Sequence, residues 1–199
     1  MKPAAIGVRM HSGWGALVAV SFVAGKVEIL ERRRIEVIDT AAPGAKQPYH
    51  FAKDLDLPRA EKFIGKCFAD SQQLAASALR DLLAELSARK YRVKGAAIVL
   101  ASGRPLPPLA KILAAHPLLH TAEGQFFREV FAKACEICDV PIDGIRERDL
   151  DERVRSDFGK SATMVQRQLS AQGPKIGPPW TTDQKTAALA ALTLLAKKR

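Results

Sequence analysis

The residues that could do chemistry in this chain are few, because it contains only four histidines. His116 precedes His120 by four residues, and His120 precedes Glu123 by three, a spacing that puts His120 and Glu123 on one face of a helix. Such a His/Glu pair can bind a metal such as Zn²⁺ or act as a general base. Catalytic zinc uses three protein ligands, so the alternative is structural: Thr121 caps a helix whose positive N-terminal end favours Glu123.

Two further candidates lie far from this pair in the chain. His11 stands in a glycine-containing turn, and Asp183 stands near the start of an Ala-Leu-rich segment. Thr181 and Gln184 have the spacing of a capping box, which predicts that a helix begins there. A rebuilt hydrolase or nuclease site would combine His11, His120, Glu123 and Asp183 with Mg²⁺, Mn²⁺ or Zn²⁺.

The cysteines indicate a reduced compartment. Cys135 and Cys138 form a lone C-x-x-C at the end of an amphipathic segment, and the chain has only three cysteines in all. Without a second pair or a preceding strand, we predict packed thiols rather than a redox or metal site. The first ten residues lack the apolar core of a secretory signal, and the longest apolar run, Ala187–Ala196, is too short to cross a bilayer. We therefore expect a cytoplasmic protein without a membrane partner.

The charge of the chain favours a polyanionic partner. Its 31 Lys and Arg against 21 Asp and Glu give a formal net charge of +10 and a pI of about 9.8, typical of proteins that bind nucleic acid or phosphorylated ligands. A basic surface that only maintains solubility is the alternative. Ser102–Arg104 could form an anion-binding turn with Arg104 or a plain turn, and Arg32–Arg34 and Lys197–Arg199 are interpreted as solvated basic runs.

The apolar patterns predict one α/β domain over residues 1–199. Short apolar or alternating segments predict an antiparallel meander of three strands, and a later continuous apolar run predicts a strand buried on both faces. Three- and four-residue spacing of apolar residues predicts the helices. The expected strands are 4–10, 15–22, 27–37, 95–101 and 141–145, and the expected helices are 63–86, 121–138, 161–172 and one from 181. Residues 40–58 are expected to form a loop, 146–157 a linker or the start of a helix, and 197–199 a basic tail.

Two segments of the second half carry a family resemblance. Phe158–Ala162 is followed by Val165-Gln166, a proline-containing loop and then Asp183–Leu189. This succession resembles the second half of the RuvC-type Holliday-junction resolvases, members of the ribonuclease H-like superfamily. Ile6-Gly7-Val8 and the turn after it look like the first hairpin of that family. The resemblance implies a mixed five-stranded sheet flanked by helices and a nucleic-acid partner that is branched or otherwise structured.

The chain departs from the family at the residues that hold metal. The resemblance implies a carboxylate cluster that binds two Mg²⁺ ions about 4 Å apart and activates water. The first carboxylate position, after Gly7-Val8, holds Arg9, and the buried fourth strand offers only Ile98–Leu100. Asp183 matches the last-helix motif, but the position three residues on holds Thr186. One of four motif positions keeps its charge, and Arg9 would repel Mg²⁺.

Three functions follow from these observations. The first is a catalytically degenerate domain that binds nucleic acid or acts as a scaffold without cofactor; the residues expected to contact nucleic acid are Arg9, His11, Trp14, Arg104 and Lys160. The second is an enzyme with the rebuilt His/Glu/Asp site and Mg²⁺ or Mn²⁺. The third is a protein–protein interaction module, for which a protein partner or a homodimer would be expected.

Overall fold

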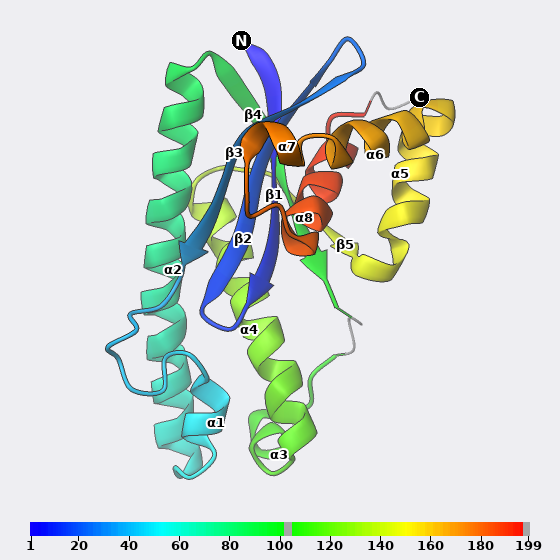
Figure 1. The fold of residues 1–199 in the computed structure, drawn as a ribbon. Helices are drawn as coiled ribbons and strands as arrows, with labels where there is room; N and C mark the ends of the chain where they lie inside the picture. Colours follow the sequence, from blue (N-terminus) through cyan, green and yellow to red (C-terminus); the bar gives the residue numbers. More distant parts are fainter. Residues whose placement is uncertain (102–104, 197–199) are drawn as a thin grey trace.

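The computed structural model describes residues 1–101 and 105–196, which are built around a five-stranded sheet (Figure 1). The strands pair in the spatial order β3-β2-β1-β4-β5. β3, β2 and β1 are antiparallel, whereas β4 pairs parallel with β1 and β5 pairs parallel with β4. The predicted sheet, a meander followed by two strands, is confirmed. The strands are β1 (Lys2–His11), β2 (Trp14–Val23), β3 (Lys26–Glu36), β4 (Tyr91–Leu100) and β5 (Ile142–Arg146).

Helices cover both faces of the sheet (Figure 1). The α-helices are α1 (Pro48–Ala52), α2 (Leu57–Ala88), α3 (Leu109–Leu113), α4 (His116–Ile137), α5 (Leu150–Phe158), α6 (Ala162–Ser170), α7 (Gly173–Ile176) and α8 (Thr182–Thr193). Two short 3-10 helices, η1 (Glu147–Asp149) and η2 (Gly159–Ser161), precede α5 and α6.

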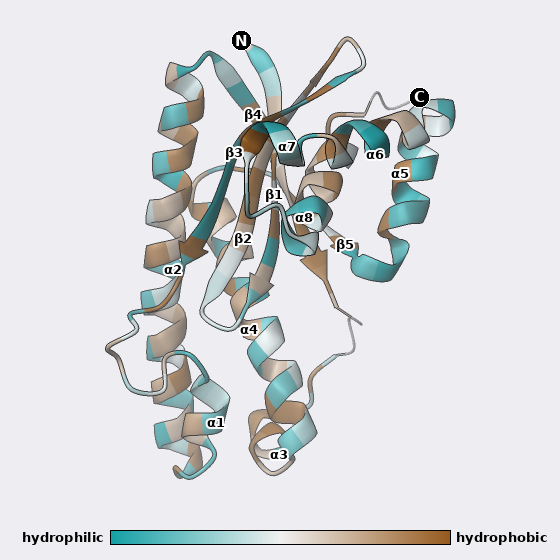
Figure 2. Cartoon of the chain, viewed as in Figure 1, coloured by the Kyte–Doolittle hydropathy of each residue, from teal (hydrophilic) through white to brown (hydrophobic). Residues whose placement is uncertain are grey.

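The alternation of side chains along β1 divides the core between these two layers. Ile6 and Val8 point to the face that α2 and α4 cover, where they join a cluster with Phe127 and Phe131. Ala5 points to the opposite face and packs with Ala187 and its neighbours on α8. Hydrophilic and apolar bands alternate along α2, as expected for a helix with one buried face (Figure 2). None of the described helices is both long enough and apolar enough to span a bilayer.

The β4 strand is buried as its apolar run predicts. Residues 95–99 are all buried between β1 on one side and β5 on the other. A strand with helices on both faces and paired strands on both edges has no contact with water, so both of its faces must be apolar.

The structure refines the predicted connections between the main elements. The loop 40–58 contains α1, and α2 already begins at Leu57, with Pro58 in its first turn and the Asp56 side chain as its cap. Of the two alternatives for residues 146–157, a linker or the start of a helix, the helix is confirmed: after the last residue of β5 they form η1 and most of α5, which buries Leu150 and Val154. α3 was not predicted, because a five-residue helix is too short to show a periodic pattern.

The helix predicted to start at Thr121 begins five residues earlier, at His116. Its cap is Ala115, and Pro117 supplies the fixed backbone angle that suits a first turn. The Thr121 hydroxyl donates to the carbonyl of Pro117, 3.0 Å away and one turn back within the helix. Thr121 is therefore an interior residue, and its predicted capping role is wrong.

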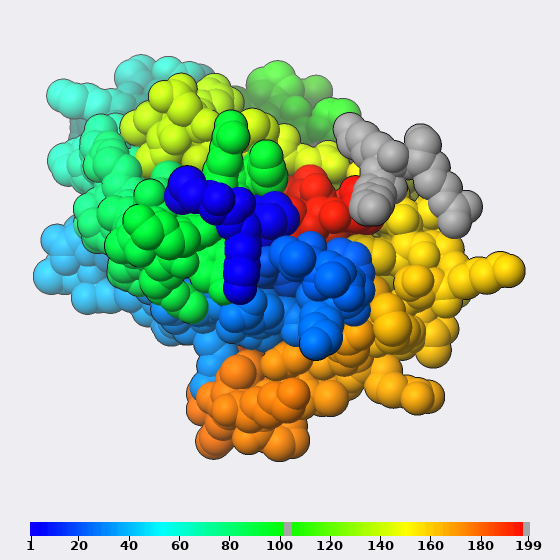
Figure 3. Space-filling view, turned by 90° about the horizontal axis from the view of Figure 1, so that it is seen from above, coloured from blue at the N-terminus to red at the C-terminus, as the bar shows by residue number. Residues whose placement is uncertain are grey.

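The two ends of the sheet are occupied by different elements. The N-terminus, the turn between β2 and β3, and α7 meet at one end, which Figure 3 shows from above. β1 runs away from this end, so its last residues, Arg9 and His11, lie at the other end, near the start of α8 (Figure 1). The candidate site lies at this second end.

Candidate functional site

The crossing of α8 over β1 places Arg9 opposite Asp183. The two elements are in close contact at Gly7, where an added Cβ would lie 1.8 Å from the carbonyl oxygen of Ala187. Starting at this contact, a step of two residues forward along β1 covers about 7 Å, and a step of four residues back along α8 covers about 6 Å. These steps lead to Arg9 on the strand and Asp183 on the helix, whose side chains therefore meet.

The capping box that the sequence predicts is present and fixes the start of α8. The backbone N–H of Gln184 donates to the Thr181 hydroxyl at 3.4 Å, and the Thr181 N–H donates to Oε1 of Gln184 at 2.9 Å. Asp183 consequently lies in the first turn of α8, where the positive end of the helix dipole favours a carboxylate.

The Arg9 guanidinium joins two carboxylates from different parts of the chain. Its Nη1 lies 3.3 Å from Oδ1 of Asp183 and 2.8 Å from Oε1 of Glu147 in η1. Nε2 of His11 lies 2.9 Å from the other oxygen of Asp183, Oδ2. Both oxygens of Asp183 thus have a basic partner. Arg9 keeps 26% of its side-chain surface exposed, so water screens these pairs and each stabilises the fold by about 1 kcal/mol or less.

A stack of flat side chains continues from His11 across the sheet. The rings of His11 and Trp14 are nearly parallel, 10° apart in orientation with centroids 4.2 Å apart. The guanidinium carbon of Arg34, on β3, lies 3.9 Å from the centroid of the Trp14 ring, a cation–π contact. His11 and Trp14 are partly exposed, so this surface combines aromatic and cationic groups at the edge of the Arg9 site.

The donor set at this site does not fit a pair of magnesium ions. Two Mg²⁺ ions need several carboxylate oxygens directed at a shared open space. Here the Asp183 and Glu147 carboxylates face the Arg9 guanidinium. The neighbouring end of β4 supplies only the apolar residues 98–100, and Thr186 supplies only a hydroxyl.

His120 and Glu123 belong to a separate group on the opposite face of the sheet. Glu123 is 3% exposed, and its Oε1 accepts hydrogen bonds from the backbone N–H groups of Tyr49 at 2.9 Å and His50 at 3.1 Å. Oε1 of Glu123 also lies 3.3 Å from Nδ1 of His50. The ring centroids of His50 and His120 are 4.7 Å apart. α4 covers one face of the sheet and α8 the other, so the structure does not bring His120 and Glu123 into one site with Asp183.

Sequence reasoning missed His50 and Glu147. His50 lies in the segment 40–58 that was predicted as loop, and the proline at the start of α1 was the only signal of a helix there. Glu147 lies in the predicted linker 146–157, among seven other charged residues between 146 and 155, so nothing in the sequence distinguished it.

The other predicted contact residues lie apart from the Arg9 site. Lys160 is exposed in η2, and the length of α5, about 14 Å, separates η2 from Glu147 in η1. The predicted turn at 102–104, which includes Arg104, lies outside the described residues, as does the predicted tail at 197–199.

The predicted solvated run Arg32–Arg34 is instead held by protein groups. Arg32 donates to the backbone carbonyls of Ile176, Pro178 and Pro179. Arg33 pairs with Glu31 and with Glu85 of α2. Only Arg34 combines an ion pair, with Glu36, and a position on the Trp14 stack.

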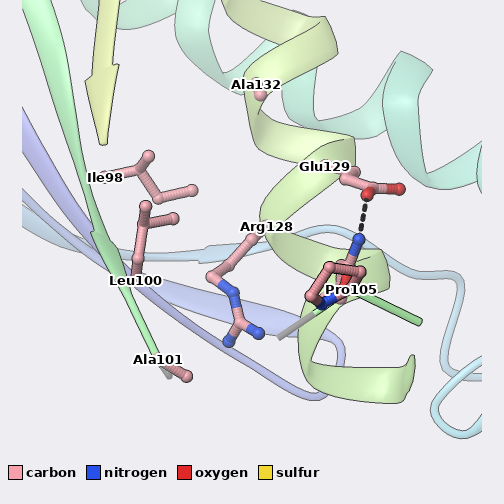
Figure 4. A pocket seen from close by; sticks show the side chains of 8 residues that line it. Ile98, Leu100, Ala101, Pro105, Arg128, Glu129 and Ala132 are labelled. Atoms are coloured by element: carbon pink, nitrogen blue, oxygen red, sulfur yellow. Dashed lines mark hydrogen bonds between the residues drawn. The ribbon is translucent and has the colours of Figure 1, made fainter. Parts of the chain in front are cut away.

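A pocket of about 290 Å³ lies between the end of β4 and α4 (Figure 4). Its walls are mainly apolar, with Ile98 and Leu100 on one side, and the Arg128 side chain extends from α4 toward them. Burial lowers the pKa of the Arg128 guanidinium, although Glu129 opposes the shift. Because Ile98 faces α4, this pocket opens on the side of the sheet away from Asp183.

The cysteines are packed thiols, as predicted. All three are free, and Cys67 and Cys135 are buried. Burial raises the pKa of Cys135 to about 12, so this thiol stays protonated and unreactive near neutral pH.

Comparisons with known proteins give structural matches only. No protein-family model and no curated protein matches the sequence. Among solved structures, the chain is similar to Thermus thermophilus RuvC in complex with a Holliday junction substrate, with a TM-score of 0.53 and 12% identity over 96% of this chain and 90% of that one. A second Thermus thermophilus RuvC structure matches with a TM-score of 0.50 and 11% identity over 96% of this chain and 92% of that one. The chain therefore has the ribonuclease H-like fold of RuvC.

Proposed function

We propose that this ribonuclease H-like chain is a nucleic-acid-binding domain that has lost metal-dependent cleavage. The observation that carries the proposal is the contact of Arg9 with Asp183 and Glu147. At an effective dielectric constant near 20, two unit charges 4 Å apart interact by about 4 kcal/mol, so the guanidinium repels a divalent cation at that distance by about 8 kcal/mol and cancels the attraction of one carboxylate. Arg9 thus replaces a metal as the counter-charge of both carboxylates.

The binding half of the proposal is supported by charge and by the Trp14 stack. The net charge of +10 attracts phosphate backbones over long distances. His11, Trp14 and Arg34 form a stack at the Arg9 end of the sheet, with Trp14 between the other two. This stack brings aromatic and cationic groups together, the combination that proteins use to bind bases and phosphates. One structural neighbour, Thermus thermophilus RuvC, was solved with a Holliday junction substrate. We extend that ligand class, branched or otherwise structured nucleic acid, to this chain.

The test is a fluorescence-anisotropy titration of the full chain with a four-way junction, a duplex and a single strand, in EDTA and at two salt concentrations. We expect binding that weakens steeply with salt, because phosphate contacts release counterions. We also expect no cleavage of the junction when Mg²⁺ or Mn²⁺ is added. Failure to bind any of the three at low salt would remove the binding half of the proposal, and metal-dependent cleavage would remove the other half.

Substitutions at the stack locate the binding surface. Trp14→Ala is expected to weaken binding roughly 5-fold or more, because it removes the ring that holds His11 and Arg34 in place and because aromatic contacts to bases contribute about 1–3 kcal/mol. Arg34→Ala is expected to weaken binding and to lower the salt slope by about 1, as loss of one phosphate contact does. Lys133→Ala is the matched control, because it removes one positive charge from α4, on the opposite face of the sheet. Equal losses in Arg34→Ala and Lys133→Ala would mean that binding depends on net charge alone.

The contact between His11 and Asp183 favours a second candidate, a hydrolase with a rebuilt site. A histidine held by a carboxylate is a common general base, and Nε2 of His11 lies 2.9 Å from Oδ2 of Asp183. This enzyme would cleave nucleic acid, and its activity would be lost in both His11→Ala and Asp183→Asn. Cleavage that survives both substitutions would assign the activity to other residues.

A further inference from the structure

Three of the four histidines meet where α1 packs against the start of α4. His50 comes from α1, and His116 and His120 lie one turn apart on α4. Each offers a ring nitrogen such that the three ligand atoms lie within 4.8 Å of one another. The ring centroids are 4.6 to 5.5 Å apart. Ligand atoms of a tetrahedral zinc ion with Zn–N distances near 2.0–2.1 Å are about 3.4 Å apart. Small rotations of the exposed His116 and His120 rings would close the remaining distance.

The fixed member of the group is His50, and a buried carboxylate orients it. Its side chain is 18% exposed, and its Nδ1 lies 3.3 Å from Oε1 of Glu123. Nε2 of His50 is then the nitrogen left for a ligand. Histidines that bind metals commonly donate their other ring N–H to a carboxylate in this way, which sets the ring orientation and strengthens the donor nitrogen.

Only one of the two carboxylate oxygens of Glu123 has hydrogen-bond partners among the described residues. Its Oε2 is buried and has no hydrogen-bond partner among the described residues. Burial raises the pKa of the Glu123 carboxyl, because the charged form is poorly solvated there.

We propose that His50, His116 and His120 bind one divalent transition-metal ion of the class that prefers imidazole, with Zn²⁺ as the reference ion. Three neutral nitrogen ligands with an adjacent carboxylate suit Zn²⁺, Ni²⁺ or Cu²⁺ and are poor ligands for Mg²⁺. His116 and His120 are exposed, so the fourth coordination position faces solvent and would hold water. The ion would tie the five-residue helix α1, and with it the long connection between β3 and α2, to α4. This site is independent of the Arg9 site and of the proposed function.

The first measurement is Zn²⁺ binding to the untagged full chain after treatment with EDTA, by calorimetry. We expect one ion per chain and a rise in the melting temperature on addition of Zn²⁺, because a ligand that binds only the folded state stabilises it. His116→Ala and His120→Ala are each expected to weaken Zn²⁺ binding by at least about 100-fold, since loss of an outer carboxylate partner alone costs roughly 10–100-fold. Glu123→Gln removes only this outer partner, so it is expected to weaken Zn²⁺ binding by roughly 10–100-fold.

His11→Ala is the matched control, because it removes the histidine that lies outside the group. His116 and His120 are exposed, so their substitution should leave the melting temperature without metal unchanged, which separates loss of binding from loss of fold. The visible spectrum of the Co²⁺ form should show nitrogen and oxygen ligation without thiolate charge-transfer bands. The proposal would be overturned if the unsubstituted chain took up no stoichiometric Zn²⁺, or if the Co²⁺ form showed thiolate bands. It would also be overturned if His116→Ala and His120→Ala bound Zn²⁺ as tightly as the unsubstituted chain does.

Discussion

Gly7→Ala is expected to lower the free energy of unfolding by about 3 kcal/mol or more, the largest effect of any single methyl group that we predict for this protein. Overpacking of a core usually costs about 1–3 kcal/mol. The clash here is more severe, because the new Cβ would lie 1.8 Å from a backbone oxygen and 2.6 Å from a backbone carbon of Ala187. Neither atom can move without displacing α8 from the sheet.

The consequence of Gly7→Ala extends to the candidate site. Since the same contact sets the register of α8 on β1, its loss should also separate Arg9 from Asp183. Urea unfolding measures the stability change, and Gly65→Ala is the control. Gly65 is exposed within α2 and has no atom within 4 Å of an added Cβ, so alanine should stabilise the chain there by about 0.5–1 kcal/mol. A Gly7→Ala variant as stable as the unsubstituted chain would show that α8 does not pack on β1 as described.

Arg9→Asp is expected to create a binding site for Mn²⁺ that the unsubstituted chain lacks. The substitution removes the cation that now contacts Asp183 and Glu147 and adds a third carboxylate beside them. The local charge of these three residues changes from −1 to −3. Hard divalent cations bind clusters of carboxylate oxygens, so calorimetry or Mn²⁺ electron paramagnetic resonance should detect binding in the variant.

Arg9→Asn separates the two contributions to this result. It removes the guanidinium and keeps the shape of aspartate, but it adds no charge. We expect Arg9→Asp to bind Mn²⁺ at least about tenfold more tightly than Arg9→Asn, which corresponds to about 1.4 kcal/mol. Mn²⁺ binding by the unsubstituted chain that equals binding by Arg9→Asp would show that Arg9 does not exclude metal, and the proposed loss of cleavage would have to be abandoned.

Local patterns in the sequence were sufficient to predict the strands of the sheet and the start of the helix that carries Asp183. The unbroken apolar run at 95–101 reflects burial on both faces of β4. The alternation along 27–37 predicts a strand, but a register shift at Leu30 puts Val27 and Ile29 on the α8 face of the sheet and Ile35 and Val37 on the α2 face. The capping box at Thr181 and Gln184 is likewise a contact between residues three apart. The position of Arg9 after Gly7-Val8 and the match at Asp183 came from the family resemblance, which the similarity of folds supports.

The partners of these residues depend on packing between distant segments. Glu147 reaches Arg9 across 138 positions of the chain, and His50 meets Glu123 across 73. Neither pairing produces a periodic pattern in the sequence. Each involves a short element, η1 or α1, whose position depends on the larger elements against which it packs. Packing also divides the four predicted site residues into two groups, His11 with Asp183 and His120 with Glu123. A sequence shows which residue types are available. The face of the sheet that each helix covers is determined only when the layers pack.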